Sequence, residues 1–246
     1  MRIIADLAAR RSLIKLYYSE GRKVLLKAAQ PVIHRAEYLT ADELKSHVRR
    51  LLNGSEIEDY YVNLWSKCGG SNAHQIVQRI RAQKEESISD WERRYRKYAA
   101  ERSAKVVGAI LDTEAEMINS VIDKYIADGV SEGLGVDQIA RNMRGSLADD
   151  LVNMQRYEAQ RIAQTEVIGS SNMGSFEGAK STGLDILKFW MTSGLPNVRP
   201  SHQEYQDMGD QDMDYEYNTG LQYPGDPNGE AEEVINCHCT IGYNVD

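Results

Sequence analysis

The stretch Trp91-Glu92-Arg93-Arg94-Tyr95-Arg96-Lys97-Tyr98 has the periodicity that decides the fold class of this chain. Its aromatic residues recur at spacings of four and three, so they share one face of an α-helix. Apolar residues continue at spacings of mostly three, four or seven from Ile76 to Tyr125. This pattern predicts one long helix, or two in series, packed as a hairpin or bundle.

The cations of this stretch fall largely outside the aromatic face. Aromatic residues interleaved with cations are typical of a nucleic-acid groove, but a packed helix with a solvated back has the same pattern. We predict that the aromatic residues pack and that the cations contact phosphate groups or a protein partner. The predicted DNA- or partner-binding residues are Arg93, Arg94, Arg96, Lys97, Arg102 and Lys105.

Charge is distributed unevenly along the 246 residues. The net charge of −8 combines +8 over residues 1–105 with −16 over residues 106–246. A basic half favours contact with a polyanion or an acidic protein surface, although exposed helices are often rich in Lys and Arg. We expect weak, salt-dependent binding to double-stranded DNA without sequence preference.

Further helices are expected on both sides of the periodic tract. Thr40-Ala41-Asp42-Glu43 is a capping-box pattern that begins a helix. A short helix is predicted from Ser55 to Lys67, ended by Gly69-Gly70, and another from Val136, ended by Gly145. The tract 148–179 is predicted to be mostly helical. Its three spaced glycines would let another backbone approach closely: Gly169, Gly174 and Gly178.

The carboxy-terminal part has a different pattern. Residues 187–191 alternate as in a β-strand, and residues 240–243 form a second strand candidate, so we predict that the two pair. The predicted fold class is mainly α with a small α+β carboxy-terminal domain. The expected domains are a basic helical arm or bundle over residues 1–130 and an α+β domain over residues 131–246.

Composition excludes several protein classes. Apolar residues make up 41% and charged residues 27%. The sequence has no run of roughly 18 uninterrupted apolar residues, so no membrane span is expected. The first residues are too quickly charged for a secretory signal. Three cysteines, with Cys68 isolated, argue against a disulfide framework and favour a reducing compartment.

Candidate metal ligands lie near the end of the chain. Thiolate and imidazole groups are preferred zinc ligands, and the sequence offers His202, Cys237 and Cys239. His238 would then point elsewhere, and the fourth ligand would be a carboxylate such as Asp207, or a water molecule. The alternative is that the cysteines are small buried residues and that His202 bonds a loop backbone. The expected cofactor is therefore none or a structural zinc ion.

The acidic run from Asp210 to Asn218 places oxygen ligands at alternate positions, as an EF-hand loop does. Tyr215 stands where that loop needs glycine, and Leu221 where it needs a bidentate glutamate. A solvated acidic loop is therefore the expectation.

A longer series of residues resembles a known family. The series comprises Arg161-Ile162-Ala163-Gln164-Thr165-Glu166, Asn172, Gly183, Lys188-x-Trp190, Val198-Arg199-x-x-His202, Tyr223-Pro224-Gly225-Asp226 and Asn236-Cys237-His238-Cys239. In order and approximate spacing it resembles the phage Mu F-like minor head protein family, also called the phage head morphogenesis family, over roughly residues 126–241. The family usually has Arg where Gln164 stands, and more often Cys-Arg-Cys at the end.

The resemblance implies a non-enzymatic minor head protein of a tailed double-stranded DNA phage or prophage. Its implied partners are the portal protein and capsid or scaffold proteins, and its implied location is the virion or procapsid, with the host cytoplasm during assembly. Structural roles are expected for Arg161, Thr165, Glu166, Trp190 and Arg199, with Arg161 or Glu166 holding the loop around Arg199. The alternative is a metal-dependent hydrolase or nuclease that uses His202, Cys237 and Cys239.

Overall fold

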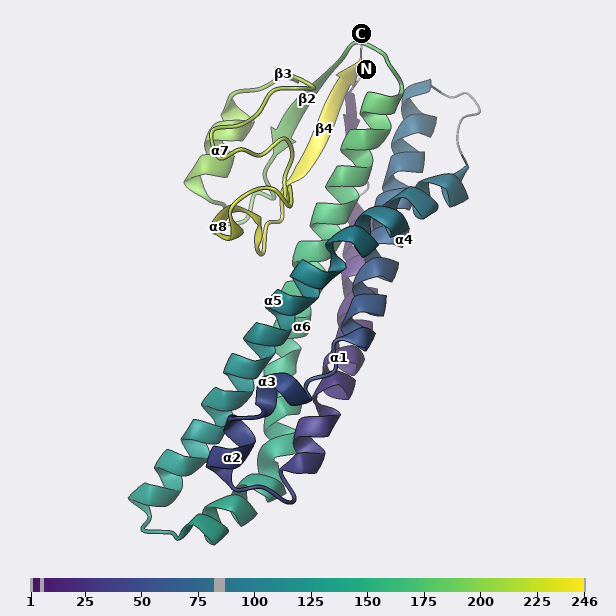
Figure 1. Ribbon diagram of the computed structural model, residues 1–246. Helices are drawn as coiled ribbons and strands as arrows, with labels where there is room; N and C mark the ends of the chain where they lie inside the picture. Colours follow the sequence, from purple (N-terminus) through teal and green to yellow (C-terminus); the bar gives the residue numbers. More distant parts are fainter. Residues whose placement is uncertain (1, 5–6, 82–86, 246) are drawn as a thin grey trace. The chain divides into compact units, whose positions relative to one another are not determined.

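The computed structural model describes residues 2–4, 7–81 and 87–245, and it is mainly helical with a small sheet (Figure 1). The fold class predicted from the sequence is therefore confirmed. The helices are α1 (Leu7–Arg35), α2 (Ala41–Lys45), α3 (Val48–Leu51), α4 (Ser55–Arg81), α5 (Ile88–Ser131), α6 (Val136–Ser181), α7 (Pro200–Asp207) and α8 (Ala231–Val234). The strands are β1 (Arg2–Ile4), β2 (Ile186–Met191), β3 (Gln211–Asp212) and β4 (Thr240–Val245). Among the described residues, every helix is too polar or too short to cross a membrane.

The chain forms two compact units. Unit 1 consists of Met1–Tyr18, Val62–Ala99 and Arg161–Asp246, and unit 2 consists of Ser19–Tyr61 and Ala100–Gln160. Each unit takes residues from both sides of position 130, so this division differs from the expected boundary between residues 1–130 and 131–246. The division into a helical arm over residues 1–130 and an α+β domain over residues 131–246 stays a prediction.

The sheet belongs to unit 1 and has the strand order β1-β4-β2-β3. Strands β2 and β4 are antiparallel neighbours, with Ile186 opposite Val245 and Met191 opposite Thr240. This confirms the predicted pairing of the two carboxy-terminal strand candidates. The sequence did not reveal β1, which comes from the amino terminus and pairs with the other edge of β4.

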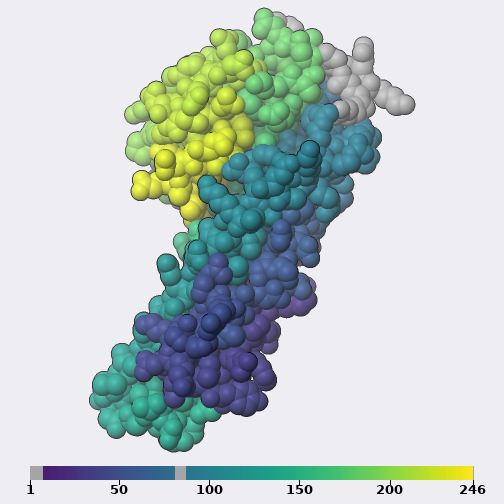
Figure 2. Space-filling model, viewed as in Figure 1, coloured from purple at the N-terminus to yellow at the C-terminus, as the bar shows by residue number. Residues whose placement is uncertain are grey.

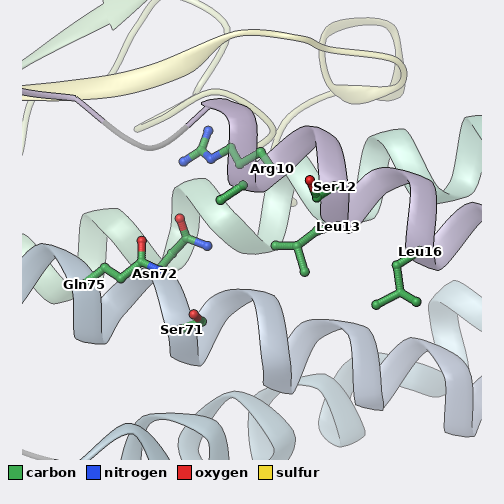
Figure 3. A pocket seen from close by; sticks show the side chains of 8 residues that line it. Arg10, Ser12, Leu13, Leu16, Ser71, Asn72 and Gln75 are labelled. Atoms are coloured by element: carbon green, nitrogen blue, oxygen red, sulfur yellow. The ribbon is translucent and has the colours of Figure 1, made fainter.

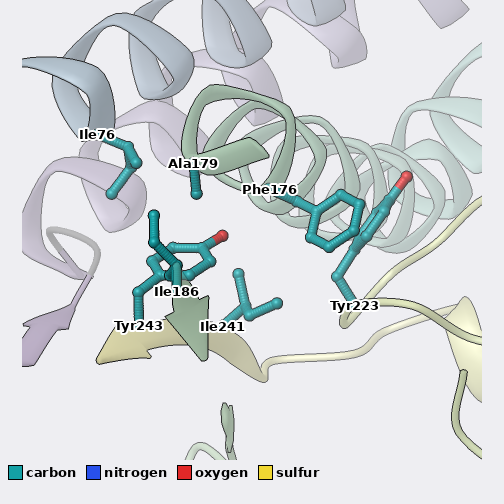
Figure 4. Close-up of a cluster of buried hydrophobic side chains, with 7 residues drawn as sticks. All are labelled: Ile76, Phe176, Ala179, Ile186, Tyr223, Ile241 and Tyr243. Carbon is teal, nitrogen blue, oxygen red and sulfur yellow. The ribbon is translucent and has the colours of Figure 1, made fainter. Parts of the chain in front are cut away.

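The core of unit 1 lies between the sheet and two helices. Ile76 of α4 and Phe176 of α6 pack against Ile186, Ile241 and Tyr243 of the sheet (Figure 4). Figure 1 shows the last turns of α6, in green, running beside β4, in yellow. In the space-filling view of Figure 2, the side chains of the green-to-yellow carboxy-terminal residues gather into one body. The sheet is therefore anchored on α4 and α6.

Helix α4 does not end at Gly69-Gly70 as expected but continues to Arg81. The two glycines serve packing. A Cβ atom at Gly69 would lie 2.5 Å from the ring of Tyr95, and one at Gly70 would lie 2.8 Å from the backbone nitrogen of Glu92. The missing side chains let α5 cross α4 at short range, so these glycines do not act as helix breakers here.

Helix α6 is also continuous, and the predicted end at Gly145 is wrong. Nothing lies within 4 Å of a Cβ atom built at Gly145. Further along α6, a Cβ atom at Gly174 would lie 2.1 Å from the carbonyl oxygen of Gly69, and one at Gly178 would lie 2.7 Å from that of Ala73. The predicted close approach of another backbone to this helix is confirmed, and α4 is one of its neighbours.

The aromatic face of residues 91–98 is largely buried. Trp91 and Tyr95 are 3% and 4% exposed and pack with Ala73 and Val77 of α4. The cations Arg93, Arg94, Arg96 and Lys97 are exposed, as is Lys105, while Arg102 is half-buried. Arg93 pairs with Asp90, and the Arg94 guanidinium lies 4.7 Å from the centre of the Trp91 ring. The packing prediction is confirmed, and DNA or partner binding by the cations stays a prediction.

In unit 2 the predicted capping box is present. The Thr40 hydroxyl accepts the backbone N–H of Glu43, and the Glu43 carboxylate accepts the backbone N–H of Thr40. Deeper in this unit the Gln155 amide is fully buried and donates to the Leu25 carbonyl at 3.3 Å and to the Glu114 carboxylate at 3.2 Å. The core of unit 2 thus contains a hydrogen-bonded polar group that joins α1, α5 and α6.

Lys188 of β2 is fully buried in unit 1, which the alternation of the strand did not predict. Its ammonium group donates to three loop carbonyls, those of Met213 at 3.0 Å, Tyr215 at 2.6 Å and Gln222 at 2.9 Å. Burial lowers the pKa of Lys188 to about 8. The ammonium ties the acidic run 210–218 to the residues that follow it, because it donates to the Met213 and Tyr215 carbonyls of that run and to the Gln222 carbonyl beyond it.

Replacing Lys188 by Met should lower the free energy of unfolding by about 2–4 kcal/mol, because three partly buried carbonyls would lose their donor. Lys180→Met is the matched control, since Lys180 is exposed and pairs with Asp214 on the surface. It should cost less than about 1 kcal/mol. Urea unfolding of both variants measures the difference, and equal losses would contradict the role of Lys188.

Replacing Gly174 by Ala should lower the free energy of unfolding by about 1–3 kcal/mol or more, because the new methyl group meets a backbone carbonyl that cannot rotate away. Gly145→Ala in the same helix is the control. Its methyl group meets nothing, and Ala favours the helix by about 0.5–1 kcal/mol over Gly, so stability should rise. A loss of stability in both variants, measured by thermal unfolding, would contradict the packing argument.

Candidate metal centre

The side chains of His202, Cys237 and Cys239 meet in unit 1, as predicted from the sequence. Their ligand atoms all lie within 4.8 Å of one another, and all three residues are buried. The His202 Nδ1 atom is 3.8 Å from Cys237 Sγ and 3.5 Å from Cys239 Sγ. His238, between the cysteines, is exposed and stands apart from this group.

These distances fit the edges of a tetrahedral zinc site. With a Zn–N bond of about 2.0 Å and Zn–S bonds of about 2.3 Å, nitrogen and sulfur ligands should lie about 3.5 Å apart. The two observed nitrogen–sulfur distances are close to that value. One imidazole nitrogen and two sulfur atoms are therefore placed where a soft divalent ion would need them.

The second ring nitrogen of His202 faces a carboxylate. Its Nε2 atom lies 2.9 Å from Glu233 Oε2, and the Ser201 hydroxyl donates to the same carboxylate at 3.0 Å. Metal-ligating histidines commonly have a carboxylate at the other ring nitrogen, which fixes the ring and raises its basicity. Sequence reasoning missed Glu233, because its place opposite His202 depends on the loop between α7 and α8.

Arg199 holds the segment that carries Glu233. Its guanidinium donates to the carbonyls of Glu232 and Ile235, both at 2.6 Å. Arg199 immediately precedes α7, which begins with Pro200 and places His202 in its first turn. One side chain therefore ties the start of α7 to the end of α8 and to the residues before Cys237.

Helix α6 positions the Cys237–Cys239 loop. The Thr165 hydroxyl accepts the Asn236 N–H at 3.1 Å, and the Gln164 amide donates to the Cys237 carbonyl at 3.4 Å. The Asn172 amide donates to the Cys239 carbonyl at 3.1 Å. Asn236 itself has a φ of 55°, a left-handed conformation that Asn tolerates better than most residues. The chain therefore reverses just before Cys237, and three α6 side chains hold it there.

The two thiols are electrostatically coupled. The Cys237 thiol donates toward the Cys239 sulfur, which lowers the pKa of Cys239 and raises that of Cys237. Burial acts against ionisation of both cysteines, whereas His202 favours the Cys239 thiolate. Burial also lowers the pKa of His238. The pair thus favours one thiolate beside an imidazole, the state from which metal binding begins.

Aromatic side chains enclose the centre. The Trp190 ring lies 4.9 Å from the His202 ring and 5.1 Å from each of the Tyr205 and Tyr217 rings, measured between ring centres. Together with Leu221 and the two cysteines, these residues form one buried cluster. The apolar wall excludes water and strengthens any charge interaction inside it.

The remaining predicted residues lie elsewhere. Glu166 accepts the indole N–H of Trp65 at 2.7 Å, so it holds α4. Arg161 is a half-buried residue of α6. Asp207 accepts the Gln203 amide, and it is not in the one group of metal-ligating side chains found among the described residues. Asp214 of the acidic run pairs with Lys180.

No family model matches this chain, and no solved structure matches it. A curated protein of Enterococcus faecalis (strain ATCC 700802 / V583), named NAD(+)--arginine ADP-ribosyltransferase EFV, is 29% identical over 136 residues. That match covers 53% of this chain and 26% of the relative, so the chain matches about a quarter of the relative's length.

The name of this relative corrects the function expected from the sequence. We expected a non-enzymatic minor head protein, with a metal-dependent hydrolase or nuclease as the alternative, whereas the relative is named as a transferase, which is an enzyme. The expectation failed because it came from a series of short motifs. Such a series can indicate a fold, but one fold can carry different activities. The family resemblance itself stays a prediction.

Proposed function

We propose that His202, Cys237 and Cys239 bind one zinc ion that stabilises the fold of unit 1. The observation that carries the proposal is the geometry of His202, whose Nδ1 faces two sulfur atoms while Nε2 faces Glu233. Zinc accepts this ligand set, and a buried site dominated by sulfur and nitrogen disfavours magnesium and calcium.

A structural role follows from what the ligands connect. His202 lies in α7, and the cysteines directly precede β4, which pairs with both β1 and β2. An ion bound to all three would therefore join the loop region to the sheet. Because the ligands meet only in the folded chain, the free energy of metal binding adds to the free energy of folding. A water molecule or another small ligand would complete the tetrahedron.

The purified chain should contain about one zinc ion, and its removal by a chelator should lower the melting temperature. When free zinc exceeds its dissociation constant 1,000-fold, the stabilisation is about 4 kcal/mol. Cys239→Ser should remove most of it, whereas a packing role alone would cost about 1 kcal/mol. Metal analysis, the absorption of the cobalt-substituted protein and thermal unfolding measure these effects.

His238→Ala is the matched control, because this residue lies between the two cysteines and is exposed. The variant should keep its metal and its melting temperature. Equal metal content in the parent chain and the Cys239→Ser variant would overturn the proposed site, as would a melting temperature indifferent to zinc.

We further propose that the chain takes part in the transfer of ADP-ribose from NAD⁺ to arginine side chains. The 29% identity to the named transferase supports this proposal. In that reaction an arginine nitrogen bonds to the ribose C1 atom, the bond from C1 to nicotinamide breaks, and nicotinamide and a proton are released. The match covers 26% of the relative, so the proposal assigns no catalytic residue on this chain.

The zinc-loaded chain should release nicotinamide from NAD⁺ only when an arginine analogue such as agmatine is present. Chromatographic detection of nicotinamide and of ADP-ribosyl-agmatine measures the reaction. Absence of both products, with a chain shown to be folded, would contradict a direct part in the transfer. The zinc proposal is tested separately, because its readouts are metal content and stability.

The partners and location implied by the family resemblance stay predictions. Gln164, which stands where the family usually has arginine, still reaches the Cys237 carbonyl through its neutral amide.

A further inference from the structure

Asn172 of α6 joins the loop of the two cysteines to two other segments of unit 1. Its amide nitrogen donates to the Cys239 carbonyl at 3.1 Å and to the Pro224 carbonyl at 2.9 Å. Its amide oxygen accepts the Thr240 hydroxyl at 3.2 Å. The Asn172 side chain is fully buried, so water does not compete for these hydrogen bonds. One side chain therefore binds both the residue before β4 and the first residue of β4.

Arg10 of α1 extends this set of hydrogen bonds. Its guanidinium donates to the Thr240 hydroxyl at 2.7 Å, and the two residues are 2% and 3% exposed. Figure 3 shows Arg10 near the start of α1, with its guanidinium directed away from Leu13 and Leu16. Burial lowers the pKa of Arg10 to about 10, so the group stays protonated at neutral pH. A charged donor therefore faces the Thr240 hydroxyl.

The guanidinium of Arg10 fixes the direction of the hydrogen bonds that follow. A guanidinium has only donors, so the Thr240 oxygen accepts from it and the Thr240 proton is left for another acceptor. That acceptor is the Asn172 oxygen, and the amide nitrogen is thereby turned toward the Cys239 carbonyl. An amide turned the other way would place its oxygen against two carbonyl oxygens, which have no proton to donate. The three side chains thus form one chain of donors and acceptors that runs from Arg10 to Cys239.

We propose that Arg10, Thr240 and Asn172 form a positioning relay that holds the loop of the two cysteines and thereby sets how tightly the candidate metal centre binds zinc. This inference rests on the proposed zinc site. The relay acts through the Cys239 backbone, because a held carbonyl keeps both sulfur atoms near His202 before the ion arrives. A ligand set that is already in place needs less ordering when the ion binds, so less of the binding free energy is lost.

Thr240→Val tests the relay, because valine has nearly the shape of threonine and lacks the hydroxyl group. The Asn172 oxygen then loses its donor, and the amide is free to turn. We expect zinc affinity, measured by competition with a chromogenic chelator, to fall about tenfold, the lower end of the loss caused by removing a hydrogen-bond partner of a metal ligand. The absorption of the cobalt-substituted variant should shift with the changed ligand geometry. Thr240→Ser keeps the hydroxyl and should restore both measurements.

A second measurement does not depend on zinc. In the metal-free chain, Thr240→Val should let a thiol reagent label Cys237 and Cys239 about fivefold faster, because each lost hydrogen bond makes local opening easier, while the buried Cys68 keeps its rate. Thr182→Val is the matched control, since Thr182 is also buried in unit 1 and its hydroxyl donates to a carbonyl at the end of α6. That variant should lose stability but keep its zinc affinity and labelling rates.

Asn172→Asp decides the question if Thr240→Val does not fold. It keeps an oxygen for Thr240 but loses the donor to the Cys239 carbonyl, so zinc affinity should fall at least as far. The relay is overturned if the folded variants keep the zinc affinity and labelling rates of the parent, or if Thr182→Val shows the same losses. If the parent binds no zinc, the proposed metal site fails, and the labelling rates of the metal-free chain still decide whether the relay holds the loop.

Discussion

The contact between the backbones of α4 and α6 is the constraint on which the candidate metal centre depends. A Cβ atom at Gly174 would lie 2.1 Å from the Gly69 carbonyl oxygen, so the contact exists only because Gly174 lacks a side chain. It fixes the part of α6 whose Thr165 and Asn172 side chains hold the loop of the two cysteines. Any side chain that separated the helices would move these hydrogen-bonding groups away from Cys237 and Cys239. The close contact at Gly174 thus supports the candidate metal centre indirectly, because it positions the helix whose side chains hold the loop of the two cysteines.

Lys188 and Arg10 are two buried cations of unit 1 whose hydrogen-bond donors are satisfied to different extents. Lys188 directs its three ammonium N–H donors at three carbonyls. Its burial therefore orders the loop, and each of its donors has an acceptor. Arg10 has five N–H donors and one described acceptor, the Thr240 hydroxyl. Thr240 in turn donates to the Asn172 amide, which binds the Cys239 carbonyl. Arg10 is thereby linked to the metal-site loop through a chain of hydrogen bonds, and its environment bears on the order of that loop.

The sequence predicted the helical fold, the pairing of β2 with β4 and the meeting of His202 with the cysteines, because each depends on a local pattern or on one pairing step. It failed at Gly69-Gly70 and Gly145, where a rule based on local propensity treats glycine as a break. At Gly69-Gly70 the close approach of α5 overrides that propensity, and at Gly145 an exposed helical position tolerates its modest cost. Lys188 was missed because alternation assigns a cation to the solvent face, and only the folded loop supplies three carbonyls to receive it. Glu233 was missed for the same reason, since no spacing relates it to His202.

The surroundings of His202 favour the proposed structural role of an ion over a hydrolytic one. A metal-dependent hydrolase needs a general base that can reach the water bound to the metal. The nearest suitable carboxylate is Glu233, and it lies 2.9 Å from His202 Nε2, the ring nitrogen opposite the ligand atom, while its oxygens also accept from Ser201. With an ion bound at Nδ1 as proposed, Glu233 would orient the histidine from outside the coordination sphere. Trp190, Tyr205 and Tyr217 pack around His202 with apolar surface. The charges and contacts of this centre are therefore arranged to hold a loop, a short helix and a sheet together.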